Sequence, residues 1–378
     1  MVVPSIIFLH YGRADYLVRA VRQARVANPN ALIFFLGDEA SIPSVLPYAE
    51  CHDVAQYSAG AAQFLKSYVH MSRDPAQFTG RNIARWFVLR DFCRSRGIAS
   101  FFHVDSDVLV FAPVESILAR FNRAFGAFDV ALALASDSYS TCGHASLWLD
   151  LDRLAEFCAM VEAIYTLANP AAFLDLVAFH HLPIESGVRN AGLVSDMKLL
   201  DMFVRQTTAR VVDSNVILEG VMLDHNINLS KQVGHPFKMA DGIKRVVWRG
   251  DVPHAVLADG GGLVGLAALH CQGRAKQHIR TFTPAIRGDD EAPAIEGTAA
   301  PESLVTAAYR VLLGREPDAE GLRAWTDQIR AGLPPLQMLR AFVDSEEFNG
   351  LSIIGRDDMQ PKRDLVVTLQ NLLRQRPH

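Results

Sequence analysis

The sequence contains little cysteine, and its few cysteines are scattered. Five occur among 378 residues, an odd number with wide gaps between them. A disulfide framework uses an even, closely spaced set in a short chain, and a zinc knuckle places cysteines two to four residues apart. The pattern excludes both and favours reduced thiols in a cytoplasmic protein.

Long apolar runs and an excess of basic residues are also missing. No run approaches the roughly 20 apolar residues that span a bilayer. The first apolar stretch, residues 2–9, lacks the basic flank of a signal peptide and reads as a strand. The formal net charge of −4 gives no electrostatic footprint for nucleic acid. We expect a cytoplasmic protein without nucleic-acid partners, with membrane contact limited to peripheral association at the inner face.

One acidic segment stands out against these absences. Asp105 and Asp107 lie between two mainly apolar runs, 101–104 and 108–111, whose lack of an amphipathic period predicts strands buried on both faces. Carboxylates in such a place cost free energy unless a cation compensates them. Carboxylate oxygens at a strand end suit Mg²⁺ or Mn²⁺, which also bind substrate phosphates. The segment predicts a divalent-metal site for a nucleotide diphosphate.

A second Asp-x-Asp pair shows that the spacing alone is a weak signal. Asp150 and Asp152 precede a segment with helical character, where they read as a helix cap and a first-turn acid. Only Asp105 and Asp107 lie between two predicted buried strands. Context therefore selects the first pair, and the second remains its alternative.

The beginning of the chain predicts a strand at 5–9, a helix that includes Leu17 and Ala24, and a second strand at 31–36. Strand, helix and strand at this spacing indicate a right-handed βαβ unit and a parallel sheet, hence an α/β fold. Ligands of such sheets bind beyond the carboxyl ends of the strands. His10, Tyr11 and Asp38 fall there and predict a nucleoside pocket, although Asp38 is equally suited to capping a turn.

A helix is predicted over 81–92. Its Arg81 and Arg85 lie four residues apart and could reach a diphosphate, the alternative being a solvated or salt-bridged face. Farther along, Gly143 and His144 enter a predicted strand, where glycine lets the backbone approach a ligand and the imidazole supplies a donor.

Two later segments complete the candidate site. Ser195 is a candidate N-cap with Asp196 at the first helical position, and the alternative for Asp196 is a contact to a sugar. His270 ends a predicted strand and is followed by a glycine turn and Lys276, which suits a third metal ligand and a phosphate-binding ammonium.

Taken together, these segments resemble a GT-A-type, nucleotide-sugar-dependent glycosyltransferase. Segment 101–111 looks like the acidic DXD metal motif of that fold. Segment 270–276 is similar to the His-x-x-Gly-x-x-Lys signature of retaining members that resemble the bacterial galactosyltransferases. The resemblance spans roughly residues 3–282. It leaves 41–80 and 165–190 unassigned, and with them the acceptor.

The resemblance implies a mixed, mainly parallel Rossmann-like sheet with flanking helices, and a role for each candidate residue. Its metal ligands for Mn²⁺ or Mg²⁺ would be Asp105, Asp107 and His270. The residues expected to bind the nucleotide sugar, with a UDP-sugar favoured, are His10, Tyr11, Asp38, Arg85, Asp105, Gly143 and Lys276. The catalytic candidates are His144 and Asp196, the latter as the base if the reaction inverts configuration.

The implied activity is sugar transfer to a carbohydrate, glycolipid or glycoprotein acceptor in the synthesis of a bacterial surface glycan. Two alternatives remain open. One is a sugar nucleotidyltransferase, although no glycine-rich, basic phosphate loop follows the first strand. The other is a non-catalytic glycan- or protein-binding module with a degenerate transferase site.

The end of the chain differs in composition. Residues 283–302 are rich in Pro, Gly, Ala and acids and predict a linker between the transferase domain, 1–282, and a smaller C-terminal part. Apolar stripes predict short helices within 303–350, two of them over 319–330 and 335–343. The segments 309–325 and 345–348 resemble a small helical domain of unassigned function found in bacterial surface-associated proteins and beside glycosyltransferases. We expect it to serve oligomerisation or glycan recruitment. A polar tail is expected over 351–378.

Overall fold

The computed structural model describes residues 3–136, 140–188, 190–232, 234–260 and 262–283, and in the C-terminal part 301–309, 315–331 and isolated positions up to 345. The chain divides into two compact units, Met1–Arg287 and Gly288–His378. Nearly all of the predicted linker and the whole of the predicted tail lie outside the described residues, so those boundaries stay predictions.

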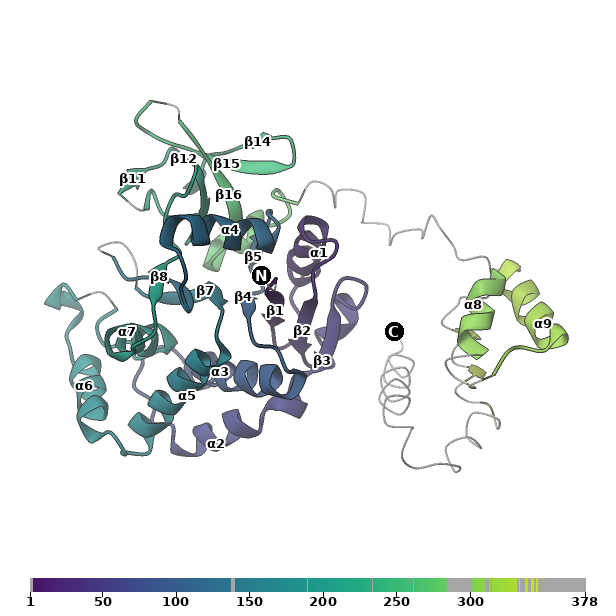
Figure 1. Cartoon of the computed structure of the whole chain (residues 1–378), viewed down its shortest axis with the longest axis horizontal. Helices are drawn as coiled ribbons and strands as arrows, with labels where there is room; N and C mark the ends of the chain where they lie inside the picture. The colour runs from purple at the N-terminus through teal and green to yellow at the C-terminus, as the bar shows by residue number, and fades with distance from the viewer. Residues whose placement is uncertain are drawn as a thin grey trace. The chain divides into compact units, whose positions relative to one another are not determined.

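A mixed, mainly parallel sheet forms the centre of the first unit (Figure 1). Its strands pair in the order β3-β2-β1-β4-β7-β6-β8. Strand β7 is antiparallel to both of its neighbours, and the other neighbouring pairs are parallel. The bounds are β1 Ser5–Leu9, β2 Ile33–Gly37, β3 Glu50–Asp53, β4 Phe101–Val104, β6 Val130–Ala133, β7 Cys142–Trp148 and β8 Val211–Asp213. The predicted α/β class is confirmed.

Helices cover both faces of this sheet because its inner strands are apolar at nearly every position. Along β1, Ile6 and Phe8 enter one core, and Ile7 and Leu9 enter the other. Helices α1 (Leu17–Ala27) and α4 (Val114–Phe125) contribute to the first core. The second core draws on α2 (Ala59–Ser67), α3 (Ala76–Arg96), α5 (Leu151–Tyr165), α6 (Pro170–His180) and α7 (Asp196–Gln206).

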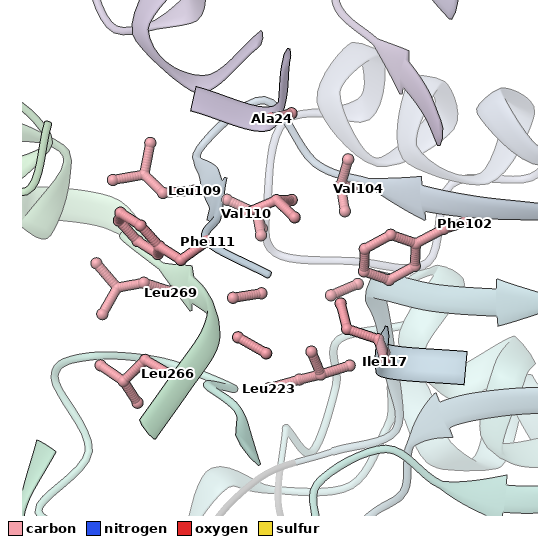
Figure 2. Packing of buried hydrophobic residues seen from close by; sticks show 14 of the residues in the cluster. Ala24, Phe102, Val104, Leu109, Val110, Phe111, Ile117, Leu223, Leu266 and Leu269 are labelled. Carbon is pink, nitrogen blue, oxygen red and sulfur yellow. The ribbon is translucent and has the colours of Figure 1, made fainter. Parts of the chain in front are cut away.

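A second sheet pairs strands in the order β14-β15-β16-β5, with β9 also paired to β16. Figure 2 shows the core beside it, where Leu109 of β5 and Leu269 of β16 belong to the same cluster as Phe102 and Val104 of β4. The bounds are β5 Val108–Val110, β9 Val221–Leu223, β14 Val246–Arg249, β15 Val252–Val256 and β16 Leu263–His270. Two small hairpins accompany it, β10 Lys231–Gln232 with β11 His235–Pro236, and β12 Met239–Ala240 with β13 Ile243–Lys244.

The second unit contains α8 (Pro301–Ala308) and α9 (Ala319–Arg330). Asp318 caps α9 by accepting a hydrogen bond from the backbone N–H of Gly321 at 2.7 Å. The unit has an apolar core of its own, which includes Val305, Met338 and Phe342. The helix predicted near 335–343 falls largely outside the described residues.

Within the described ranges, no single helix is long and apolar enough to cross a membrane. Helices α5 and α6 meet that length and composition only as a pair, which is bent by 78° at the break between them.

Candidate active site

The sheet topology brings chain segments that are distant in sequence to one edge. Strands β1, β2 and β4 run parallel, so His10, Asp38 and Asp105 all follow carboxyl ends at that edge. Strand β7 runs the opposite way and therefore begins there. The backbone N–H of Asp105 donates to the carbonyl oxygen of His144 at 2.8 Å.

The second sheet adds its contribution through β5 and β16. In this antiparallel pair His270 lies opposite Val108, and the N–H of Cys271 donates to the carbonyl of Asp107 at 2.9 Å. The short helical turn Gly273–His278 then places Lys276 beside Asp107. These contacts bring Asp107, His270 and Lys276 together. The metal-binding and phosphate-binding roles assigned to them, and the convergence of Asp105 on the same point, stay predictions.

Asp107 is the carboxylate on which the basic groups converge. Its Oδ1 lies 3.6 Å from His270 Nε2, and its Oδ2 lies 3.2 Å from Lys276 Nζ. Burial raises the pKa of Asp107, but its interaction with His270, together with the charge of Lys276, outweighs burial and leaves that pKa below the usual value. The side chain is therefore a carboxylate at neutral pH, although it is only 8% exposed.

His270 is oriented by a backbone carbonyl. Its Nδ1 donates to the carbonyl oxygen of His225 at 2.6 Å, which turns Nε2 toward Asp107. The ring stacks on His144, with 4.3 Å between centroids and 17° between planes. Such a carbonyl bond is the usual device that fixes a metal-binding imidazole.

The divalent ion that the resemblance implies requires ligand atoms that face one another. Two lone-pair-bearing atoms, Asp107 Oδ1 and His270 Nε2, do so at a separation that two ligands of one cation can span at bonds of about 2–2.2 Å. Across the described residues, however, no group of three His, Cys, Asp or Glu side chains is arranged to hold a metal ion. The residues thus fit an ion held by two protein ligands, with its remaining positions left for substrate or water.

Asp105, the third predicted ligand, is engaged elsewhere. Arg85 on α3 donates from Nη1 to Asp105 Oδ1 at 2.6 Å and from Nη2 to Asp196 Oδ2 at 2.8 Å. Trp86 Nε1 also donates to Asp196 Oδ2, at 3.3 Å. Burial raises the pKa of Asp105, but the charge of Arg85 dominates and holds it far below its usual range. The guanidinium that the sequence assigns to a diphosphate is thus bound to two carboxylates, which was the salt-bridged alternative.

Asp38 acts as the turn cap that the sequence allowed. Its Oδ2 accepts from the N–H of Gly12 at 2.8 Å, and its Oδ1 accepts from both the N–H and the hydroxyl of Ser41. Burial raises the pKa of Asp38, and these hydrogen bonds lower it by more. Asp38 therefore ties the loops after β1 and β2 together at the site edge.

His10 and Tyr11 lie on the same edge. His10 Nδ1 is 2.8 Å from the hydroxyl oxygen of Ser106, the residue between the two aspartates. Burial lowers the pKa of His10, against the opposing charge of Asp38. Tyr11 contacts Arg81, whose guanidinium carbon lies 5.5 Å from the ring centroid.

Gly143 is required by packing. A Cβ built on it would lie 2.5 Å from the Trp86 ring. The group that packs closely against this glycine is therefore the indole of Trp86, where the sequence predicted a ligand. The Nδ1 atom of His144 lies 3.1 Å from the Cys142 sulfur.

Several residues at the site were missed by sequence reasoning. His103 is fully buried, with Nδ1 donating to the Ile7 carbonyl at 3.1 Å and Nε2 lying 3.3 Å from Asp105 Oδ1. A histidine in the middle of an apolar strand was the available signal. Trp86 left no such signal, because its role arises from tertiary contacts.

Behind the histidines lies a buried ion pair that the sequence did not reveal. Lys244 donates to Asp224 Oδ1 at 2.6 Å and to the carbonyl of Asn226 at 2.7 Å, and both charged side chains are fully buried. Asp224 directly precedes His225, whose carbonyl fixes His270. The ion pair therefore anchors the segment that orients the predicted metal ligand.

Comparisons with known proteins assign no family to the chain as a whole. A family model described as "Domain of unknown function (DUF4214)" matches residues 289–352, less than half of the chain. A search of curated proteins gives no match.

Likenesses among solved structures are distant. Mouse xyloside xylosyltransferase 1 in its apo form is similar at 11% identity over 56% of this chain and 85% of that chain, with a TM-score of 0.40. The glycosyltransferase GlyE of Streptococcus pneumoniae TIGR4 is similar at 12% identity over 56% of this chain and 45% of that chain, with a TM-score of 0.28. At such TM-scores these likenesses establish neither a family nor an activity.

Proposed function

We propose that the first unit is a metal-dependent glycosyltransferase of the GT-A type, which moves a sugar from a nucleotide diphosphate donor, with a UDP-sugar favoured, to a glycan, lipid-linked or protein acceptor. The proposed setting is the synthesis of a bacterial surface glycan in the cytoplasm, at the inner face of the membrane. The second unit would recruit the acceptor glycan or support oligomerisation.

One observation carries this proposal: Asp107, the oriented imidazole of His270 and the ammonium of Lys276 meet at the edge of a mainly parallel sheet. Ligands of such sheets bind at this edge. Asp107 and His270 would hold Mn²⁺ or Mg²⁺, which when bound supplies charge stabilisation to a departing diphosphate. Lys276 adds a second positive charge for a phosphate oxygen.

For Asp196 we propose a contact to the sugar in place of the role of a base. Its Oδ2 accepts hydrogen bonds from both Arg85 and Trp86, so this oxygen serves to hold the carboxylate in place. Its other oxygen, Oδ1, accepts no side-chain hydrogen bond from the described residues. We propose that Oδ1 contacts a sugar hydroxyl, which was the functional alternative for this residue, and that His10, Tyr11 and His144 line the donor site.

The direct test is a donor screen that measures release of UDP or GDP from a panel of nucleotide sugars, with Mn²⁺ and with a chelator. We expect release from one donor class, dependent on the metal and reduced at least about tenfold in His270→Ala, the order expected for a disturbed metal site. The matched control is His254→Ala on β15, whose ring nitrogen Nδ1 lies 3.0 Å from the Val252 carbonyl oxygen of the same strand. Equal release in His270→Ala would contradict the proposed role.

A non-catalytic binding module is favoured by one contact, the occupation of Asp105 by Arg85. In such a protein the arginine permanently replaces a cation. Metal-dependent nucleotide binding without turnover of any donor would support this second function.

A further inference from the structure

A cavity of about 180 Å³ with both polar and apolar groups in its wall lies next in the chain to the candidate site, and none of the candidate catalytic, metal-binding or nucleotide-binding residues lines it. It lies between the segment that leads into β7, the end of α6 with the segment that follows it, and one face of α7. Thr141 in its wall directly precedes Cys142, the first residue of β7, and Ser195 directly precedes Asp196. The wall of the cavity therefore includes the chain neighbours of Cys142 and Asp196, and its volume is on the scale of one sugar residue.

The charges in the cavity wall do not cancel. Arg205 and Asp201, one helical turn apart on α7, form an ion pair with each other. Lys198 on the same helix forms no ion pair within the described part of the chain. Its ammonium instead lies 4.2 Å from the centroid of the Phe179 ring, and both residues line the cavity. One positive charge is therefore left for an anion.

The rest of the wall offers hydroxyl and amide groups. Asn190 donates from Nδ2 to the hydroxyl oxygen of Ser140 at 2.7 Å, which links the turn before α7 to the strand entry. Ser195 is buried, yet its side chain makes no capping hydrogen bond to α7. Hydroxyls beside an aromatic face suit a sugar ring, and the lysine suits a carboxylate on that ring.

We propose that this cavity binds an acidic sugar, a monosaccharide that carries a carboxylate, and that the acceptor of the reaction contains it. The carboxylate pairs with Lys198, the ring lies against Phe179, and the ring hydroxyls bond to Ser140 and Asn190. The role of the sugar as acceptor rests on the proposed function, whereas the acidic-sugar site itself rests on the cavity alone.

The test compares two oligosaccharides that differ in one group. One ends in glucuronic acid, and the other is its carboxyl-reduced counterpart, which ends in glucose. Binding to the full-length protein is measured by isothermal titration calorimetry. We expect the acidic glycan to bind about tenfold more tightly, the order expected for one charge-assisted hydrogen bond.

Matched variants then locate the preference. Lys198→Gln abolishes it and Asp201→Asn, which frees Arg205, increases it, whereas Lys66→Gln on α2 leaves it unchanged. Equal binding of the two glycans, no binding of either, or a preference retained in Lys198→Gln would each overturn the proposal.

Nucleotide titration in the same preparations separates this inference from the proposed function. Lys198→Gln should bind UDP with Mn²⁺ as the wild type does. If the acidic preference holds but no nucleotide binds, the transferase proposal fails and the sugar site stands. If nucleotide binds but the acidic preference is absent, the sugar site is ruled out and the transferase proposal stands.

Discussion

Arg85 holds two carboxylates at once, with Asp105 on one nitrogen and Asp196 on the other. Only 15% of its side chain is exposed, against 25% for Asp105 and 6% for Asp196, so water can replace the arginine only in part. Removing one partner of a buried ionic group destabilises the fold more than replacing the whole group with apolar residues, because the remaining charges stay desolvated. The arrangement therefore makes Arg85 a positioning residue for both acids.

Replacing Arg85 with Gln should lower the free energy of unfolding by about 3–5 kcal/mol at pH 7. The reason is that Asp105 and Asp196 lose their shared counter-charge. Arg81→Gln, one turn earlier on α3 and exposed, is the control, and we expect it to change stability by less than about 0.5 kcal/mol. Urea unfolding followed by circular dichroism measures both.

The same pair of variants gives a pH dependence of known sign. Arg85 holds the pKa of Asp105 below its ordinary value, so in the wild type this carboxylate stabilises the fold above that ordinary value and the contribution is lost on acidification. Without Arg85, burial dominates and the pKa rises. The destabilisation by Arg85→Gln should therefore shrink as the pH falls from 7 to about 4, near the ordinary carboxyl value. A penalty that grows on acidification would refute this assignment.

At the scale of elements, the site depends on neighbouring segments that hold its residues in place without belonging to it. Strand β9 ends beside Asp224, and hairpin β12–β13 brings Lys244 to it. His225 follows Asp224 and accepts the hydrogen bond from His270. A change in this buried pair should therefore alter the orientation of the predicted metal ligand His270 as well as the stability of the fold.

Lys244→Met should destabilise the protein by about 3–5 kcal/mol, because Asp224 remains buried without its cation. Restoring neutrality with Lys244→Met combined with Asp224→Leu should recover part of this loss. Lys238→Met, exposed before the same hairpin, is the matched control. Thermal unfolding checks stability, and Mn²⁺ affinity of the folded fraction checks orientation; unchanged values in the single variant would rule out an anchoring role.

The elements that the sequence predicts well are those with a clear pattern. Strand β1 and helix α9 were predicted at their observed positions because their apolar residues recur at periods typical of strand and helix. Strand β3 was not predicted, since its four residues are mostly polar and at least partly exposed at the edge of the sheet. Helix α6 was missed too, because its own residues are apolar on every side and show no amphipathic period; Leu174, for example, is 64% exposed.

The site could be predicted only in part, for a similar physical reason. Asp105 and Asp107 are neighbours in sequence, and their context identified them. The residues that bind these carboxylates come from distant parts of the sequence. Arg85, which binds Asp105, also binds Asp196, a residue 111 positions further along the chain. Their pairing depends on how α3 and α7 pack on the sheet, and no local pattern encodes that packing.

At the scale of the whole molecule, each unit contains its own apolar core. The two cores of the first unit draw on residues up to Phe282, and the core of the second unit begins at Val305. Every contact of the candidate site named here joins residues of the first unit. The units are therefore expected to be separable.

A protein truncated after Arg287 should unfold with the same midpoint as the first unit in the full chain, and its nucleotide affinity should be unchanged within about twofold. The reason is that truncation removes no residue from its cores or its site. Differential scanning calorimetry and nucleotide titration check this. Loss of folding on truncation would mean that the first unit requires the second.

The measurement that tests the central claim most directly is calorimetric titration of UDP into the full-length protein, with Mn²⁺ and with chelator. We predict binding that requires Mn²⁺ and is weakened at least about tenfold in Asp107→Ala. Asp150→Ala, which alters the N-cap of α5 in the other Asp-x-Asp pair, should leave the affinity unchanged. Binding that persists with chelator or in Asp107→Ala would contradict a metal-dependent nucleotide site at this edge of the sheet.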